Sequence, residues 1–126
     1  MSGTDPVTTA LVIKALDAAV LRQQAIATNI ANANSVGYVP LRVNFEEQLG
    51  FVRQALSRGS PVTAADVSLL RPSIEQGPPS AAGNAAVMID MEVVKLSQNT
   101  LQYQALLKGL NHRVSILSSA INEGRR

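Results

Sequence analysis

The sequence contains no cysteine. Disulfide bonds, thiol catalysis and zinc sites built on cysteine are therefore excluded. Tryptophan is also absent, and aromatic residues make up only 3 % of the chain, so a core has to be built from Leu, Ile, Val, Met and Ala. These side chains suit helix-on-helix packing, and the hydrophobic fraction of 46 % is ordinary for a folded domain.

Long runs of one kind of residue are missing as well. The Lys and Arg residues are scattered and the net charge is only +2, so no nucleic-acid partner is predicted. The longest apolar runs, such as 85–89, are far shorter than the ~20 residues that cross a bilayer. The start, Met-Ser-Gly-Thr-Asp-Pro, has no positive region followed by an apolar core, which predicts that no cleaved signal peptide is present.

Groups able to carry catalysis are sparse. The single histidine, His112, stands in a helical stretch without a neighbour suited to acid–base chemistry. No glycine-rich phosphate loop, paired-histidine metal motif or nucleophile elbow is present. Glu46 with Glu47, and Asp90 with Glu92, are explained as acidic residues in the first turns of helices, where the helix dipole favours them. The sequence predicts no enzyme, no cofactor, no metal and no small-molecule substrate.

The first predicted element is a long helix within residues 1–33. Asp5 suits the N-cap and Pro6 the first helical position, and neither Gly nor Pro follows before residue 37. Its apolar residues form two adjacent stripes, which predicts contact with more than one neighbour. The stripes consist of Val12, Leu16, Ala19, Ile26 and Ile30, and of Leu11, Ala15, Ala18 and Ala25.

A second long helix is predicted within residues 87–126. Asp90 is the expected N-cap, flanked by a hydrophobic staple, and Gly124 the expected end. Gly109 inside it costs about 1 kcal/mol relative to Ala and indicates a close approach or a bend. The apolar positions form a heptad stripe, the pattern of a left-handed supercoiled pair. The stripe consists of Val93, Leu96, Thr100, Tyr103, Leu107, Leu110, Val114, Leu117 and Ile121, of which only Thr100 is polar.

The middle of the chain divides at residue 57. Residues 34–56 read as a turn-rich linker followed by a short helix, with Asn44 as N-cap and Glu47 three residues later. Residues 57–86 are rich in Gly, Pro and Ser and predict an extended loop, in which Val67–Leu70 is the one stretch that suggests a short strand. The apolar face of the short helix is formed by Phe45, Leu49, Val52 and Leu56.

These elements predict a mainly α fold, in which the long N- and C-terminal helices pack as an antiparallel coiled-coil-like pair. We expect the stripe of the last helix to pack inward and the second stripe of the first helix to stay exposed. At ~25 cal/mol per Å² of apolar area, such a surface drives association with neighbouring subunits. The inward contacts are expected between Leu107, Leu110, Val114 and Leu117 and the partners Val12, Leu16, Ile26 and Ile30.

The most informative segment follows the first helix and reads Asn-Ile-Ala-Asn-Ala-Asn-Ser-Val-Gly-Tyr from Asn29 to Tyr38. Asn29 and Asn32 share a face, so their amides can bond the last helical carbonyls or a neighbouring backbone. Gly37 is expected to supply a positive φ for a tight turn, after which the chain runs extended. Ordinary turn chemistry is the alternative explanation of this segment.

This segment resembles the N-terminal signature of the flagellar axial proteins, which form the rod, the hook and the hook-associated structures. The family usually has Thr-Pro-Gly-Tyr where this chain has Ser35-Val36-Gly37-Tyr38, and Phe45 also fits the pattern. Residues 87–92 and the ending 117–121 resemble the proximal-rod branch, as do the positions Leu96, Asn99, Leu101, Tyr103 and Gln104. The nearest rival is a sister rod branch, whose usual Glu-Ala-Asn signature is not found here.

The resemblance implies a structural rod subunit that transmits torque from motor to hook. It implies export through the flagellar type III apparatus and a place in the periplasmic rod of the basal body. The implied partners are copies of the chain itself, other rod subunits, and the inner-membrane ring and export-gate proteins at the rod base. The residues predicted for packing and interfaces are Leu11, Val12, Leu16, Ile26, Asn29, Ile30, Asn32, Gly37, Tyr38, Phe45, Val93, Leu96, Tyr103, Leu107, Leu110, Val114, Leu117 and Ile121.

Two other classes of protein remain open at this point. A cytoplasmic coiled-coil adaptor or export chaperone would share the heptads but would not need the Asn-rich segment. A small helical enzyme would require a partner for His112 that the sequence does not show.

Overall fold

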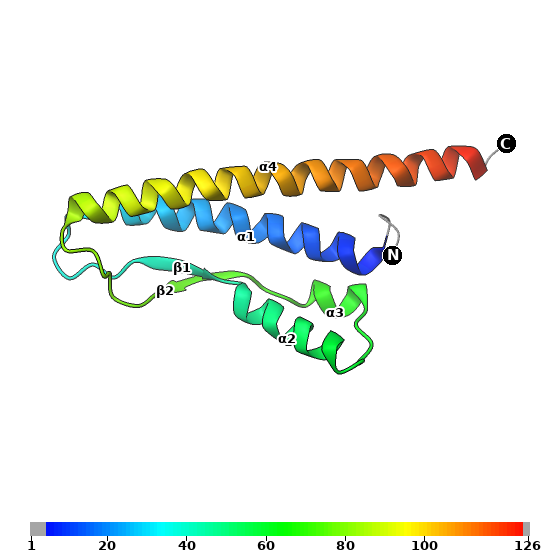
Figure 1. Cartoon of the computed structure of the whole chain (residues 1–126), viewed down its shortest axis with the longest axis horizontal. Coiled ribbons are helices and arrows are strands. Elements are labelled where there is room, and N and C mark those ends of the chain that lie inside the picture. The colour runs from blue at the N-terminus through cyan, green and yellow to red at the C-terminus, as the bar shows by residue number, and fades with distance from the viewer. Residues whose placement is uncertain (1–4, 125–126) are drawn as a thin grey trace.

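The computed structural model describes residues 5–124, so predictions for residues 1–4 and 125–126 fall outside the described part. Figure 1 shows two long helices side by side along the molecule, running in opposite directions, with the remaining elements on the far side of α1. The predicted mainly α fold with an antiparallel helix pair is confirmed. The elements are α1 (Pro6–Ala31), β1 (Leu41–Asn44), α2 (Glu46–Ser57), α3 (Ala64–Ser68), β2 (Ser73–Gln76) and α4 (Ala85–Gly124).

The helix α1 begins as its sequence predicts. The Val7 N–H donates to Oδ1 of Asp5 across 3.0 Å, and Pro6 occupies the first helical position, where no N–H partner is needed. The helix ends at Ala31, and the N–H of the C-cap residue Asn32 and its Nδ2 both donate to the carbonyl of Thr28, at 3.0 and 2.8 Å. These bonds satisfy a carbonyl of the last turn that has no partner within the helix.

The start of α4 corrects the sequence-based expectation. The helix begins at Ala85 and not at Asp90, which lies exposed within it. The actual cap is Asn84, whose Oδ1 accepts the Val87 N–H at 2.9 Å, while its carbonyl accepts the Met88 N–H at 3.1 Å. Asn and Asp are equally good N-caps, and the residues between the two positions are compatible with a helix, so the earlier cap prevails.

A two-stranded antiparallel ribbon packs on α1. Strand β1 pairs with β2 so that Leu41 lies opposite Gln76 and Asn44 opposite Ser73. Val43 and Phe45 pack against Ala18, and α3 places its fully buried Val67 in the interior. The helix α1 therefore contacts α4 on one side and the ribbon with α3 on the other. The predicted wide apolar face of this helix is confirmed, but its neighbours belong to the same chain.

The middle segment holds more structure than its composition suggests. The strand expected at Val67–Leu70 is wrong, because α3 covers its first two residues and is capped by Thr63 through a reciprocal capping box with Asp66. The second strand lies further on, in Ser73–Gln76. Those four residues include one apolar side chain and show no alternating apolar pattern. They form a strand because they pair with β1.

The expected cap of α2 is also wrong. Asn44 lies in β1, and α2 begins at Glu46 after Phe45 without a side-chain cap. Phe45 is buried against the core, which positions the backbone at this point in place of a cap. Of the predicted apolar face, Leu49 and Val52 are half-buried, while Leu56 is exposed.

Candidate assembly interface

One buried side chain joins three segments of the chain at the end of α1. The Oδ1 of Asn29 accepts the Leu41 N–H at 2.8 Å and the Tyr38 hydroxyl at 2.6 Å. Its Nδ2 donates to the Leu41 carbonyl at 3.0 Å and to Oε2 of Glu92 on α4 at 3.0 Å. The side-chain amide thus bonds both backbone groups of Leu41, as a neighbouring strand would. It also connects this segment to α4 through Glu92. We call Asn29, Tyr38 and Glu92 the polar clasp.

The charge of the clasp comes from Glu92, which is only 2 % exposed. The Lys95 Nζ donates to its Oε1 at 3.2 Å, one turn further along α4. Burial, and secondly the nearby Glu92 carboxylate, raise the pKa of the Tyr38 hydroxyl above its ordinary value. The phenol therefore stays protonated and keeps donating to Asn29 throughout the neutral pH range.

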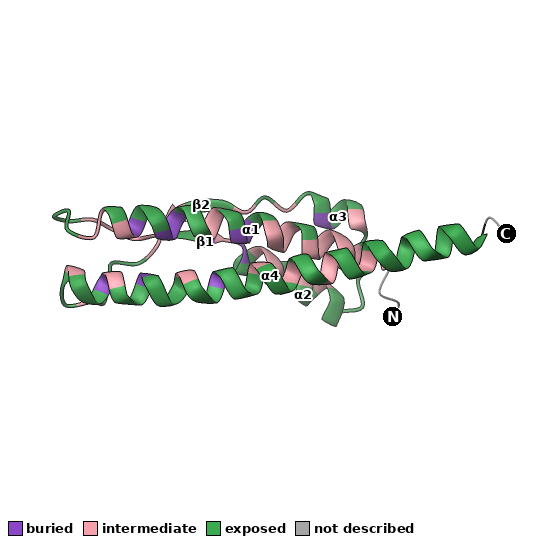
Figure 2. Cartoon of the chain, turned by 90° about the horizontal axis from the view of Figure 1, so that it is seen from above, coloured by how far each residue is buried: buried purple, intermediate pink, exposed green. Residues whose placement is uncertain are grey.

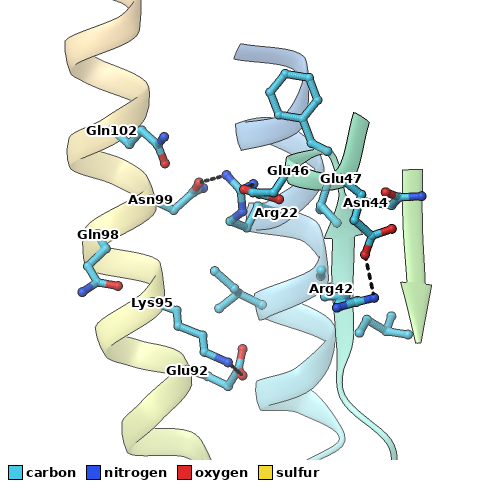
Figure 3. Close-up of a pocket in the computed structure, with 15 residues that line it drawn as sticks. Arg22, Arg42, Asn44, Glu46, Glu47, Glu92, Lys95, Gln98, Asn99 and Gln102 are labelled. Carbon is cyan, nitrogen blue, oxygen red and sulfur yellow. Dashed lines mark hydrogen bonds and ion pairs between the residues drawn. The ribbon is translucent and has the colours of Figure 1, made fainter. Parts of the chain in front are cut away.

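A second polar contact crosses the helix pair one heptad away from the first. The Asn99 Nδ2 donates to the Ala19 carbonyl at 2.8 Å, and Arg22 donates from Nη1 to Oδ1 of Asn99 at 3.4 Å. The other guanidinium nitrogen of Arg22 pairs with Glu46 at 2.8 Å, so the same arginine links both long helices to α2 (Figure 3).

A groove of about 440 Å³ opens between α1, α4 and the segment from β1 to the start of α2 (Figure 3). The charged side chains that line it form ion pairs with one another: Arg22 with Glu46, Arg42 with Glu47, and Lys95 with Glu92. Within residues 5–124, no group of three His, Asp or Glu side chains is arranged to hold a metal ion. The groove is therefore a place where ion pairs link the surrounding segments of the chain.

The predicted roles of the Asn-rich segment are confirmed within the chain. Asn29 bonds a neighbouring backbone and Asn32 the last carbonyls of α1, as expected for amides one turn apart. Gly37 has φ +73°, and Tyr38 leads into the extended segment. Glu92 and Asn99 were not predicted as cross-helix residues. The available signal was their seven-residue spacing, since a heptad separates two positions of one helix face.

The apolar stripe of α4 is only partly placed as predicted. Leu96, Tyr103 and Leu110 are half-buried and lie on the same side of α4 as the buried residues Met88, Glu92 and Asn99. The expected inward packing of Leu107, Val114 and Leu117 is wrong, because these side chains are 38, 57 and 52 % exposed. Two of the three buried residues of α4, Glu92 and Asn99, are polar, so a search for apolar periodicity does not find them. Val93 and Ile121 are exposed as well.

The other predicted residues lie as follows. On α1, Ile26 is buried and Leu11, Val12, Leu16 and Ile30 are half-buried. Phe45 is buried in the core, and Tyr38 is half-buried. The expectation that α1 keeps an exposed second stripe is wrong, because Ala18 and Ala25 are each 1 % exposed beneath the elements packed on α1.

Much of α4 is exposed (Figure 2), and of the two long helices it carries most of the exposed large apolar side chains, while α1 exposes Ile13 and Val20. One exposed set, the outer stripe, consists of Val87, Met91, Val94 and Leu101. A second set, the distal stripe, consists of Val114, Leu117 and Ile121 near the C-terminal end of α4, and its first two residues line a small hollow together with Thr9 of α1. Among the described residues no helix is long and apolar enough to span a bilayer. Apolar stripes of this kind mark surfaces for other proteins.

An antiparallel pair of long helices with apolar stripes left on one of them is the construction of a subunit of a larger assembly. Proteins of similar sequence are named as components of such an assembly. The chain is 28 % identical to the "Flagellar basal body rod protein FlgB" of Escherichia coli K12, over 88 % of this chain and 90 % of that protein. It is 28 % identical to the protein of the same name from Bacillus subtilis, with the same coverage.

A third relative, FlgB of Cereibacter sphaeroides, is 33 % identical over 79 % of this chain and 82 % of its own length. No family model matches the sequence. At this identity and coverage, the chain belongs to the FlgB family of flagellar basal body rod proteins. The resemblance to a flagellar rod protein is confirmed.

Proposed function

We propose that this chain is a structural subunit of the bacterial flagellar basal body, that it polymerises into the proximal rod, and that it transmits torque from motor to hook. The observation that carries the proposal is the free apolar surface of α4 in a chain of the FlgB family. Its proposed partners are copies of itself, other rod subunits, and the inner-membrane ring and export-gate proteins at the rod base.

The two exposed stripes lie on different sides of α4. With about 100° between successive residues, the distal stripe continues the side that faces α1, while the outer stripe lies well away from that side. Two stripes on two sides fit two different neighbours. Contacts between unlike surfaces generate open helical arrays rather than closed dimers, which is the geometry that a rod needs.

Torque transmission requires a body that does not shear. The polar clasp and the Asn99–Ala19 contact tie α1 to α4, and the Arg22–Glu46 pair ties both to α2. Buried, fully bonded polar side chains have a single favourable arrangement, so sliding one helix along the other breaks them together. This supports a role in carrying load along the axis.

The proposed location is the periplasmic rod, reached through the flagellar type III apparatus. A chain exported unfolded has to fold on arrival. Helical elements form from local contacts, which makes folding rapid. The absence of cysteine means that no disulfide has to form outside the cell.

Motility complementation of a deletion strain tests the proposal. Leu117→Asp in the distal stripe and Leu101→Asp in the outer stripe each place a charge on an exposed apolar site and should abolish assembly while the purified chain keeps its helicity. Leu110→Asp should also stop assembly, through damage to the helix pair. His112→Ala changes an exposed residue outside both stripes and should swim normally.

Normal swimming of both stripe variants would overturn the proposal. Fractionation adds a second measurement, since the chain should co-purify with basal bodies. Recovery of the chain only as a stable cytoplasmic monomer or dimer would instead favour an adaptor or export chaperone.

A further inference from the structure

The backbone of β2 presents hydrogen-bonding groups on both of its edges. The Gly77 N–H donates to the Pro40 carbonyl at 2.9 Å, so Gly77 directs its N–H toward β1. In the antiparallel register, the backbone groups of Glu75 point the same way. Successive residues of a strand direct these groups to opposite edges, so those of Ile74 and Gln76 point away from β1. Both residues are exposed, and no other segment within 5–124 bonds their backbone.

The opposite edge of the ribbon, on β1, is already covered. The Asn29 side chain bonds both the N–H and the carbonyl of Leu41. Val43, the next residue of β1 whose backbone groups point away from β2, is 6 % exposed and packs with Ala18 in the core. A strand from another molecule could therefore add to the ribbon only along β2. We call this the open edge of β2.

Proline stands at each end of the open edge. At one end, the Arg71 N–H and carbonyl both bond the side chain of Gln48, which also bonds the end of β1. Arg71 thus faces the β1 side, and Pro72 after it faces outward. At the other end, Gly77 faces β1 and Pro78 follows it. The residue before a proline is held extended, which preserves this alternation at both ends.

We propose that Pro72 and Pro78 close the open edge of β2 against strands from other copies of the chain. A proline has no N–H and carries a ring carbon in its place, so neither outward position can donate to an added strand. Only Ile74 and Gln76, between the prolines, can donate. A strand added there would form two bonded pairs and would meet a proline ring beyond each of them. Proline on an edge strand is one way in which proteins block pairing between sheets.

The closed edge bears on how copies of the chain meet. Subunits of a rod lie side by side at high density, where an unblocked edge would pair with the same edge of a neighbour. With the ribbon closed, the stripes of α4 remain as the surfaces that bind neighbours. This consequence rests on the proposed function. The closure itself is a property of the single chain and is tested without rod assembly.

A Pro72→Val/Pro78→Val variant tests the proposal. It restores an N–H at both outward positions, removes both rings and introduces a residue that favours strands. Pro78 is exposed and Pro72 half-buried, so the fold should be kept. The exchange is made in a Leu101→Asp/Leu117→Asp background, so that the stripes of α4 do not contribute to association.

The matched control is Pro61→Val/Pro79→Val in the same background. It also exchanges two prolines for valine, at exposed positions that lie outside the open edge. Pro61 is in the loop before α3, and Pro79 follows the bend at Pro78. Sedimentation velocity over a concentration series measures association, and amide exchange followed by nuclear magnetic resonance reports on single N–H groups.

The Pro72→Val/Pro78→Val variant should associate as its concentration rises, while the background chain and the control remain monomeric. Its Ile74 and Gln76 N–H groups should exchange at least about tenfold more slowly in the associated state than in the monomer, because they become bonded to the added strand. In the background chain these two N–H groups should exchange fast at every concentration, whereas the Glu75 N–H, bonded to β1, should be protected.

Two results would overturn the proposal. A folded Pro72→Val/Pro78→Val variant that stays monomeric shows that the prolines are not what closes the edge. Protection of Ile74 and Gln76 in the monomeric background chain shows that the edge is not open. If the double variant loses helicity, Pro78→Val alone, at the exposed end, is judged by the same two results. The proposed function stands or falls separately, with the motility experiment.

Discussion

The Nδ2 of Asn29 lies 3.0 Å from Oε2 of Glu92, and the two residues are 63 positions apart in the chain. Asn29 also holds the backbone of Leu41 through its N–H and its carbonyl. One side chain therefore couples docking of the extended segment to pairing of the two long helices. Neither α1 nor α4 can move without disturbing the ribbon.

Replacing Asn29 with Leu should cost at least about 3 kcal/mol of unfolding free energy, because several buried polar groups lose their partner at about 1–3 kcal/mol each. Asn32→Ala, one turn further on, removes one side-chain bond at the end of α1 and should cost less than about 1 kcal/mol. Urea unfolding followed by circular dichroism measures both. Similar losses for the two variants would contradict a special role for Asn29.

Stability should fall at alkaline pH through Tyr38. Its pKa is raised in the folded chain, so the folded state holds the proton more tightly than the unfolded state. This contribution is fully present below the unfolded pKa, near 10, and is lost as the pH rises through the folded value. We expect urea midpoints of the parent chain to drop more steeply above pH 10 than those of Tyr38→Phe.

Absorbance titration of the phenols provides a second measurement. In a Tyr103→Phe background, Tyr38 is the remaining tyrosine. Its ionisation should occur above pH 10 in the folded chain and shift downward in urea. A midpoint that urea leaves unchanged would contradict the buried environment of this hydroxyl.

Two glycines should respond to alanine in opposite directions. Gly37 has φ +73°, a region that disfavours residues with a Cβ, so Gly37→Ala should destabilise the fold by roughly 1–2 kcal/mol. Gly109 lies inside α4. A Cβ added there would meet no atom within 4 Å beyond the backbone of its own helix and its chain neighbours, so Gly109→Ala should stabilise the fold by up to about 1 kcal/mol. Thermal unfolding of both variants checks the signs, and a loss at Gly109 would indicate a contact that the monomer does not contain.

The two phenylalanines provide a test of the core. Phe45 is 4 % exposed and packs with Val43 on Ala18, so Phe45→Ala should cost about 3–5 kcal/mol through the lost burial and the cavity left behind. Phe51 on α2 is 72 % exposed, and Phe51→Ala should change the unfolding free energy by less than about 0.5 kcal/mol. If Phe51→Ala leaves stability intact but reduces motility, this end of the molecule meets a neighbour.

Much of the helical structure could be predicted because helical signals are local. Asp5 and Pro6 begin α1, and the apolar stripes mark both long helices, since capping and three-to-four periodicity involve residues within one or two turns. The predicted N-cap of α4 was wrong by six positions, because Asn84 and Asp90 are equally suitable caps. The resemblance carried by Asn29 to Tyr38 pointed to the correct family.

The sequence by itself determined the two amphipathic helices and the turn at Gly37, because each depends on neighbouring residues. Only the tertiary structure decided that β2 is a strand, since Ser73–Gln76 acquires that conformation by pairing with residues 29 to 35 positions earlier. It also decided which stripe is covered. Glu92 and Asn99 are buried on α4 because they find polar partners on α1, and a pattern of apolar residues along one chain contains no record of those distant partners.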